Sequence, residues 1–475
     1  MKFIGREKEI KILNDAYSSG ESEFIAVYGR RRIGKTFLIK HVLEDRFSFY
    51  YSGKLDLSRE MQLVAFRDAL DEQGVANPPL FSNWFQAFSQ LKKLLEGSPE
   101  DKKVIFLDEI AWMDNTRSEF LPALEGFWNE WASRRNDILL IICASSTSWI
   151  IKKVFHNRGG LYNRITGKIK LEQFSLKECE EMSKEMNLGF TRLQILSAYM
   201  ILGGVAFYWS RLKKGLSVPQ NIDNLFFSGN GILKGEFKSL YSSLFSNPDG
   251  YIKIVSALGT RNIGLTRTEI ADETKLSNNN RLGEMLEELE ECGIIYSYLP
   301  LGKRKNGTIY KLIDSLSLFH FQFLKDQEKP RSWIHMMDSP KYLSWCGISY
   351  ERVVLLHMDN VKRKLGISGM LSSQYCWFSD TKKLKQGETG AKIDLLIDRS
   401  DNIINIVEVK WTQDGRPFNM TREDEESLIN KKTALQREKN TKKGIHFTLV
   451  TTGGFTPSCY TEIIHSDVTL DDLFI

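Results

Sequence analysis

Cysteine and histidine are scarce in this chain, and neither forms a pattern. The 475 residues include six cysteines and seven histidines. No two cysteines have C-x-x-C spacing and no two histidines have H-x-x-x-H spacing, so we expect neither a zinc site nor a disulfide framework. Scattered cysteines suit a reducing compartment, and the expected location is the cytoplasm.

Long apolar runs and a strong net charge are also missing. No stretch approaches the ~18 consecutive apolar residues of a membrane span. The charged start MKFIGREKEI lacks the apolar region of a signal peptide, so a membrane partner is not expected. The net charge of +5 permits a nucleic-acid partner but does not require one. A chain of this length exceeds a single hydrophobic core, so several domains are expected.

The most informative stretch, Phe24 to Lys40, joins an apolar strand to a helix through a glycine-rich loop. The loop fits G-x-x-x-x-G-K-[ST], which predicts a cradle of backbone N–H groups for the phosphates of ATP. We expect Lys35 to reach the β- and γ-phosphates and the Thr36 hydroxyl to ligate Mg²⁺. The expected ATP contacts are Gly29, Arg30, Arg31, Arg32, Ile33, Gly34, Lys35, Thr36 and Phe37. The alternative is an arginine-rich glycine turn that fits by chance.

An apolar strand that ends in Asp108 and Glu109 has the form of a Walker B segment. Asp108 would hold Mg²⁺ through water, and Glu109 would orient and deprotonate the attacking water. The alternative is a buried strand that ends in a solvated acidic turn.

Two further polar positions are expected near the nucleotide. The apolar run Ile138 to Ala144 is the natural candidate for a strand that lies, in the sheet, between the strand of the phosphate loop and the Walker B strand. Ser145 or Ser146 directly follows this run, where its hydroxyl can contact the γ-phosphate. Arg164 would stabilise charge on the transferring phosphoryl group, within one chain or from a neighbour in a homo-oligomer. The alternative for Arg164 is a basic surface loop. Strands alternating with helices predict a parallel, doubly wound α/β sheet.

The middle of the chain predicts a winged helix. Three short helices are expected at 252–258, 266–276 and 280–292, followed by a hairpin of 294–300 with 307–313. In one interpretation Arg281 and the wing tip Lys303 to Lys305 contact DNA. In the other, the glutamates on the third helix repel phosphate and the segment packs on the ATPase lid.

The last third predicts a charged cluster on a hairpin. Strands are expected at 374–379, 392–398 and 403–411, and they carry Asp394, Glu408 and Lys410. Glu408 and Lys410 are two residues apart and face the same side, and Asp394 can lie beside them on the paired strand. Two carboxylates can hold a divalent cation there, and a lysine can activate water for attack on a phosphodiester. The alternative is a salt bridge within the sheet ladder.

Several motifs carry a resemblance to a known family. The segments Phe3 to Glu9 and Gly29 to Thr36, with LDEIAW, CASSTSW and LYNRITG at 107–112, 143–149 and 161–167, resemble the archaeal-type ATPases of the AAA+-like and STAND branch. The chain departs from that family at Ala206, where proline is usual near the adenine. The D…E-x-K cluster resembles the PD-(D/E)XK nuclease superfamily. By that resemblance Tyr350-Glu351 stands for its Phe-Glu pair, and Glu351 joins Asp394 and Glu408 as a metal ligand.

Together these patterns predict an α/β chain of four parts. They are a P-loop ATPase core at 1–171, a helical lid at 172–245, a winged helix at 246–325 and a restriction-endonuclease-like α/β domain at 326–475. The expected cofactors are ATP and Mg²⁺, and the expected partner is DNA, with RNA left open. The expected function is ATP hydrolysis joined to Mg²⁺-dependent DNA cleavage. The alternative is a nucleotide-dependent switch whose last domain is not catalytic.

Overall fold

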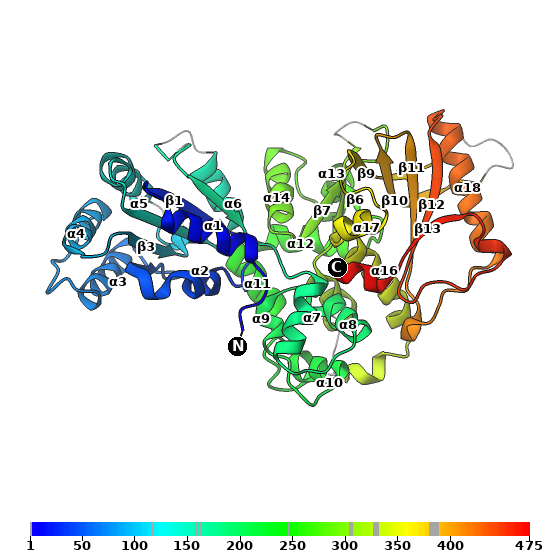
Figure 1. Ribbon diagram of the computed structural model, residues 1–475, viewed down its shortest axis with the longest axis horizontal. Helices are drawn as coiled ribbons and strands as arrows, with labels where there is room; N and C mark the ends of the chain where they lie inside the picture. Colours follow the sequence, from blue (N-terminus) through cyan, green and yellow to red (C-terminus); the bar gives the residue numbers. More distant parts are fainter. Residues whose placement is uncertain are drawn as a thin grey trace. The chain divides into compact units, whose positions relative to one another are not determined.

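The chain divides into two compact units (Figure 1). The computed structural model describes residues 2–115, 117–156, 160–161, 163–245, 247–303, 307–325, 332–379 and 389–475. The N-terminal unit comprises residues 2–173 and 242–245, and the C-terminal unit comprises residues 174–241 and the described residues from 247 to 475. Within the described ranges, none of the helices combines the length and the apolar character needed to cross a bilayer.

A five-stranded parallel sheet forms the centre of the N-terminal unit. Its strands are β1 (Glu23–Tyr28), β2 (Phe47–Ser52), β3 (Lys103–Asp108), β4 (Ile138–Ala144) and β5 (Gly167–Lys170), in the order β2-β3-β4-β1-β5. Every residue of β3 and β4 is buried, because helices cover both faces of the sheet and the strands are apolar on both sides. The predicted strand Ile138 to Ala144 does lie between β1 and β3.

The helices of this unit form two apolar layers. One layer contains α1 (Glu7–Ser18) and α2 (Lys35–Leu43), and its core includes Leu13, Leu38 and Ile39. The other contains α3 (Arg59–Glu72), α4 (Trp84–Gly97) and α5 (Phe120–Gly126), and its core is rich in aromatic rings. The short helix α6 (Thr147–Ile150) follows β4. The sheet is therefore held rigid between two layers, with the loops after β1, β3 and β4 at one edge.

The C-terminal unit begins with a group of short helices. They are α7 (Leu176–Glu185), α8 (Arg192–Leu202), α9 (Ala206–Trp209) and α10 (Val218–Ile222), and α11 (Glu236–Leu244) follows, with residues 242–244 counted in the N-terminal unit. Capping boxes at Ser175 and Thr191 fix the starts of α7 and α8. Before α9 the backbone comes very close to Phe174, since a Cβ atom at Gly204 would lie 1.9 Å from the Phe174 carbonyl oxygen.

Three helices and a small antiparallel sheet follow, close to the expected positions. The helices are α12 (Pro248–Gly259), α13 (Arg267–Thr274) and α14 (Asn280–Glu291). The sheet has the order β6-β8-β7, with β6 (Leu265–Thr266), β7 (Ile295–Tyr298) and β8 (Ile309–Leu312). Helix α15 (Ser315–Phe319) continues the chain. The β7–β8 hairpin is named the wing below.

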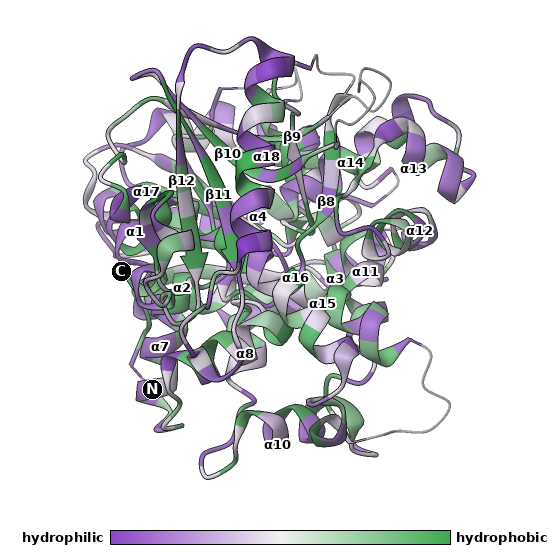
Figure 2. Ribbon diagram, turned by 90° about the vertical axis from the view of Figure 1, so that its right-hand side faces the viewer, coloured by the Kyte–Doolittle hydropathy of each residue, from purple (hydrophilic) through white to green (hydrophobic). Residues whose placement is uncertain are grey.

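A mixed five-stranded sheet completes the unit, and Figure 2 shows β10 and β11 mainly in hydrophobic colours. The order is β13-β12-β11-β10-β9, with β9 (Ser372–Phe378), β10 (Lys392–Arg399), β11 (Ile403–Lys410), β12 (Gly444–Thr451) and β13 (Ile464–Val468). Strands β9 to β11 are antiparallel and β11 to β13 are parallel, so α18 (Arg422–Lys439) serves as the crossover between β11 and β12. Helix α16 (Pro340–Leu356) packs against β11, and α17 (Met358–Lys364) follows it.

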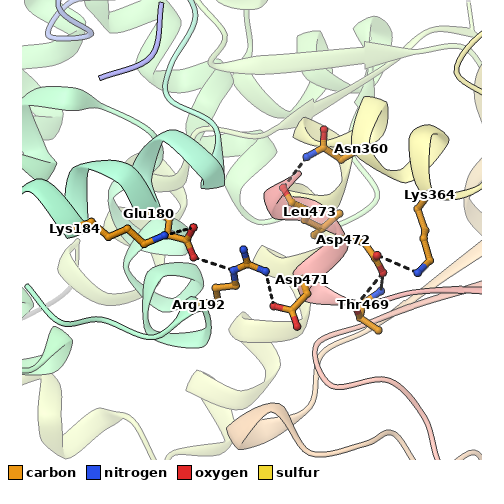
Figure 3. A network of polar contacts seen from close by, with 9 residues as sticks. All are labelled: Glu180, Lys184, Arg192, Asn360, Lys364, Thr469, Asp471, Asp472 and Leu473. Atoms are coloured by element: carbon orange, nitrogen blue, oxygen red, sulfur yellow. Dashed lines mark hydrogen bonds and ion pairs between the residues drawn. The ribbon is translucent and has the colours of Figure 1, made fainter. Parts of the chain in front are cut away.

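Polar contacts tie the first helices of this unit to the end of the chain (Figure 3). The Arg192 guanidinium on α8 bonds to Glu180 at 2.9 Å and to Asp471 at 3.0 Å. The Lys364 ammonium on α17 lies 3.0 Å from Asp472, one residue further on. These contacts join segments that are far apart in sequence, since Arg192 and Asp471 are separated by 279 residues.

Candidate nucleotide site and C-terminal charged cluster

The loop between β1 and α2 turns through three residues with positive φ. These are Gly29 at 140°, Arg32 at 69° and Gly34 at 97°. A Cβ atom at Gly29 would also lie 2.4 Å from the Leu171 carbonyl oxygen, so only glycine fits there. Left-handed residues next to right-handed ones direct successive N–H groups into one concavity, which suits an anion. The loop then opens directly into the N-terminus of α2.

Lys35 lies buried across this loop. Its ammonium donates to the carbonyl oxygens of Gly29 and Arg30, both at 2.9 Å, and to the Ser145 hydroxyl at 3.0 Å. The two carbonyl bonds hold the Lys35 side chain folded over the loop. The third bond ties that side chain to the end of β4.

Thr36 and Asp108 meet at the end of the sheet. The Thr36 hydroxyl donates to Asp108 Oδ2 at 2.8 Å, and Asp108 is buried at the last position of β3. The backbone N–H of Glu109 donates to Asp108 Oδ1 at 2.9 Å. A hydroxyl and a carboxylate side by side are the oxygen donors that Mg²⁺ takes in a nucleotide site, so this pair fits the cation chemically.

Glu109 faces Ser145 across the neighbouring strand ends. Its own backbone is left-handed, with φ 48°. The Glu109 carboxylate accepts the Ser145 N–H at 3.1 Å and the Ser145 hydroxyl at 2.5 Å. Because Ser145 also accepts a hydrogen bond from Lys35, the three side chains form one continuous chain. Of the two serines considered from sequence, Ser145 is the one that the structure places in this chain.

The remaining predicted nucleotide residues differ in their surroundings. Arg30 and Ile33 are buried and Arg31 is partly buried. Phe37 keeps 59% of its surface exposed and stacks with Phe3 at 5.5 Å, so a flat aromatic face lies beside the loop. Arg164 is exposed, and within the described residues the structure does not bring it against Lys35, Asp108 or Glu109. Tyr162, which belongs to the LYNRITG segment, lies outside the described residues.

The predicted C-terminal residues lie on paired strands. The pairing of β10 with β11 ends at Leu395 and Val407, and Asp394 and Glu408 are the next residues on the two strands. The Glu408 carboxylate is 2.6 Å from the Lys431 ammonium on α18 and 3.3 Å from that of Lys410. The Lys410 ammonium is also 3.2 Å from Asp424. The pKa of Lys410 is raised, because its carboxylate neighbours outweigh the effect of burial.

Each of the other two predicted carboxylates is also paired with a lysine. Glu351 on α16 accepts a bond from Lys311 of β8 at 2.8 Å, and Asp394 contacts Lys392 on its own strand. Burial lowers the pKa of Lys311, and the charge of Glu351 opposes that change. Across the described ranges, no group of three or more His, Cys, Asp or Glu side chains is arranged to hold a metal ion. The three residues expected as cation ligands are therefore not gathered into one such group.

Several charged residues of this cluster were not identified from sequence. They are Lys311, Arg352 and Asp424, and Lys392 beside Asp394 is a fourth. Arg352 is buried beside Glu351, donates to the Leu312 carbonyl oxygen at 2.7 Å, and has its pKa lowered to about 10 by that burial. One signal was available: Lys311 is two residues from Ile309 in a strand, so it shares the inward face of the hairpin.

Comparison with known proteins identifies a family for the N-terminal part of the chain. Residues 3–210 match the model of a family described as an ATPase domain predominantly from Archaea. An uncharacterized protein of Methanocaldococcus jannaschii is 25% identical over 416 residues, covering 86% of this chain and 87% of that protein. An uncharacterized ATP-binding protein of the same organism is 41% identical over 44 residues, which is 9% of this chain and 75% of that protein.

A solved structure shares the fold. A Walker-type ATPase of Pyrococcus abyssi superposes with a TM-score of 0.50 at 17% identity, over 68% of this chain and 96% of that chain. At this identity the likeness concerns the fold alone. The family match covers the loop, Asp108, Glu109 and Ser145, whose contacts are described above. Through residues 3–210 the chain belongs to the ATPase family found predominantly in Archaea, and it is an ATP-binding P-loop ATPase.

Proposed function

We propose that this ATPase acts on DNA and cleaves it at the C-terminal charged cluster with the help of a divalent cation. The observation that carries the proposal is the pairing of β10 with β11: Asp394 and Glu408 come directly next to the pair Leu395 and Val407, and Lys410 lies two residues beyond Glu408. These charged residues have apolar neighbours on both strands, and burying charges in such surroundings costs free energy of folding. A cluster without a function would therefore destabilise the protein with no return.

At the nucleotide site each residue takes a defined part. The loop N–H groups and the Lys35 ammonium bind the β- and γ-phosphates, for which Lys35 must exchange part of its present bonding for phosphate oxygens. Thr36 and Asp108 would hold Mg²⁺, which neutralises phosphate charge when bound. Glu109 accepts the proton of the attacking water, and Ser145 keeps the Glu109 carboxylate oriented between β3 and β4.

At the C-terminal cluster the carboxylates and the lysine divide the work. Asp394 and Glu408 would hold the cation, which supplies charge stabilisation for the phosphodiester when bound. Lys410 positions the attacking water, since its ammonium lies between Glu408 and Asp424. Asp424 fixes the direction of the Lys410 side chain from the first turn of α18.

A cleavage assay tests this proposal. Supercoiled plasmid is incubated with the full chain and Mg²⁺ or Mn²⁺, and wild type is compared with Glu408→Ala and Lys410→Ala. The matched control is Glu423→Ala, an exposed carboxylate at the start of α18. We expect cleavage by wild type and the control and its loss in both cluster variants. Equal cleavage by all four proteins would refute the assignment of the cluster.

The second candidate function is a nucleotide-dependent switch without nuclease activity. It is favoured by the lysine partners of Glu351, Asp394 and Glu408 and by the fixed position of the wing. The Leu301 N–H beside the wing donates to the Cys376 carbonyl oxygen of β9 at 2.9 Å, so this segment packs on the protein near the tip expected to meet DNA. Lys305 of that tip lies outside the described residues. ATP hydrolysis with intact DNA and RNA in every assay would select this candidate.

A further inference from the structure

Lys311 is an unusual residue for a hairpin strand because it is almost completely buried. Only 1% of its surface is exposed, although a lysine normally keeps its ammonium in water. Its Nζ donates to Glu351 Oε1 at 2.8 Å. Glu351 is the residue that stands in the position of a metal-binding carboxylate on α16. A wing residue therefore occupies the carboxylate that the proposed nuclease would use.

Neighbouring contacts hold Lys311 in this position. The Arg352 guanidinium, which follows Glu351, donates to the carbonyl oxygen of Leu312, the residue after Lys311, at 2.7 Å. Tyr296 on β7 donates to the Gln374 side chain of β9 at 3.3 Å, so both strands of the wing are anchored. Lys311 thus cannot move aside from Glu351 unless the wing moves with it.

The charges around the cluster disfavour the binding of a divalent cation. The positive side chains are Lys311, Arg352, Lys392, Lys410 and Lys431, and the negative ones are Glu351, Asp394, Glu408 and Asp424. Among the residues that the structure describes, five of these cations thus accompany four carboxylates before any metal binds. An added divalent cation would meet net repulsion and would have to displace a lysine from each carboxylate that it uses.

We propose that Lys311 masks Glu351 and keeps divalent cations out of the C-terminal cluster in the resting protein. This inference rests on the proposed function, since it concerns the cation of the same site. The ammonium of Lys311 takes the place of the positive charge that Glu351 would otherwise bind. Withdrawal of the wing from α16 exposes Glu351, so the position of the wing decides whether the cluster takes its metal.

Mn²⁺ binding by the nucleotide-free full chain tests the proposal without an activity readout. Free Mn²⁺ is followed by its paramagnetic resonance signal in wild type, in Lys311→Met, and in Lys311→Met combined with Glu351→Gln. The matched control is Lys364→Met, which removes an exposed lysine paired with Asp472. Any Mn²⁺ held by Thr36 and Asp108 is common to all four proteins and cancels in the comparison.

We expect Lys311→Met to bind Mn²⁺ about tenfold more tightly than wild type, because one buried positive charge is gone. Lys364→Met should match wild type, and the added Glu351→Gln should remove the gain. A folded Lys311→Met protein with wild-type Mn²⁺ affinity would overturn the proposal. If Lys311→Met does not fold, Lys311→Gln decides instead, since its amide can still donate to Glu351 without a positive charge and the same gain is required. Absence of DNA cleavage would refute the nuclease but leave this result intact.

Discussion

Ser145 is the residue that joins the two ends of the proposed ATPase chemistry. It accepts a hydrogen bond from Lys35 and donates one to Glu109, so the phosphate-binding and water-activating side chains share one partner. The sequence spacing identifies Lys35 and Glu109 through their motifs, but it only narrows the polar partner to two serines. Which serine faces the site depends on how β4 ends, and spacing alone does not determine that.

Loss of the Lys35 ammonium is expected to abolish ATP turnover. Lys35→Ala removes the buried charge that binds the phosphates, and we expect a fall in turnover of about a hundredfold or more. The measurement is steady-state phosphate release. Lys40→Ala is the control, because Lys40 lies further along α2 and its ammonium contacts the exposed Glu44 and the Tyr50 ring. Undiminished turnover in Lys35→Ala would contradict the role of the loop.

Glu109→Gln is expected to separate ATP binding from hydrolysis. The amide can still face Ser145, but it no longer accepts a proton from water, so hydrolysis should slow by about a hundredfold. Binding of a fluorescent ATP analogue should change little, since the phosphates meet Lys35 and the loop. Equal hydrolysis rates for wild type and Glu109→Gln would remove Glu109 as the base.

Local patterns predict most elements, because each depends on residues close in sequence. Apolar runs place β3 and β4, and apolar stretches around the charged residues place β10 and β11 within a residue or two of the expected bounds. Long-range contacts are different. The docking of the wing on β9 and the burial of Lys311 depend on segments that meet only after folding, and no local period records them.

The junction between α7 and α16 should make stability depend on pH. His357, directly after α16, accepts the Leu176 N–H on Nε2 at 3.0 Å, and burial lowers its pKa from 6.5 to about 4. Below pH 6.5 the imidazole of His357 therefore becomes protonated in the unfolded chain but stays neutral in the folded chain until the pH approaches 4. Stability is full above that pH and falls as the pH decreases toward 4, by about 3 kcal/mol.

Denaturant unfolding of wild type and His357→Gln between about pH 7 and pH 4 measures this effect. The variant has no imidazole to protonate, so its midpoint should decline less over the same range. A wild-type midpoint as flat as that of the variant would contradict the assignment of His357.

The close approach at Gly204 predicts a large local cost for a single methyl group. Gly204→Ala would set Cβ against the Phe174 carbonyl oxygen, which is backbone and has little freedom to move. We expect destabilisation of about 2 kcal/mol or more by thermal unfolding. Gly347→Ala on α16 is the control, because nothing lies within 4 Å of its Cβ position and alanine favours a helix. Equal melting temperatures for the two variants would refute the clash.

At the scale of the whole molecule, the two proposed reactions belong to different units. The nucleotide residues Lys35, Asp108, Glu109 and Ser145 all lie in the N-terminal unit. The charged cluster and the wing both lie in the C-terminal unit. Separate units allow the two activities to be removed one at a time, which makes the full account testable within one protein.

The most direct test measures ATP turnover and plasmid cleavage in the same reaction. Plasmid cleavage is also measured in a second reaction without ATP. Wild type, Lys35→Ala and Glu408→Ala are compared at equal concentration. We predict that wild type shows both activities, that Lys35→Ala loses ATP turnover, and that Glu408→Ala loses cleavage while ATP turnover continues. Intact plasmid with wild type under active ATP turnover, or undiminished cleavage by Glu408→Ala, would contradict the account.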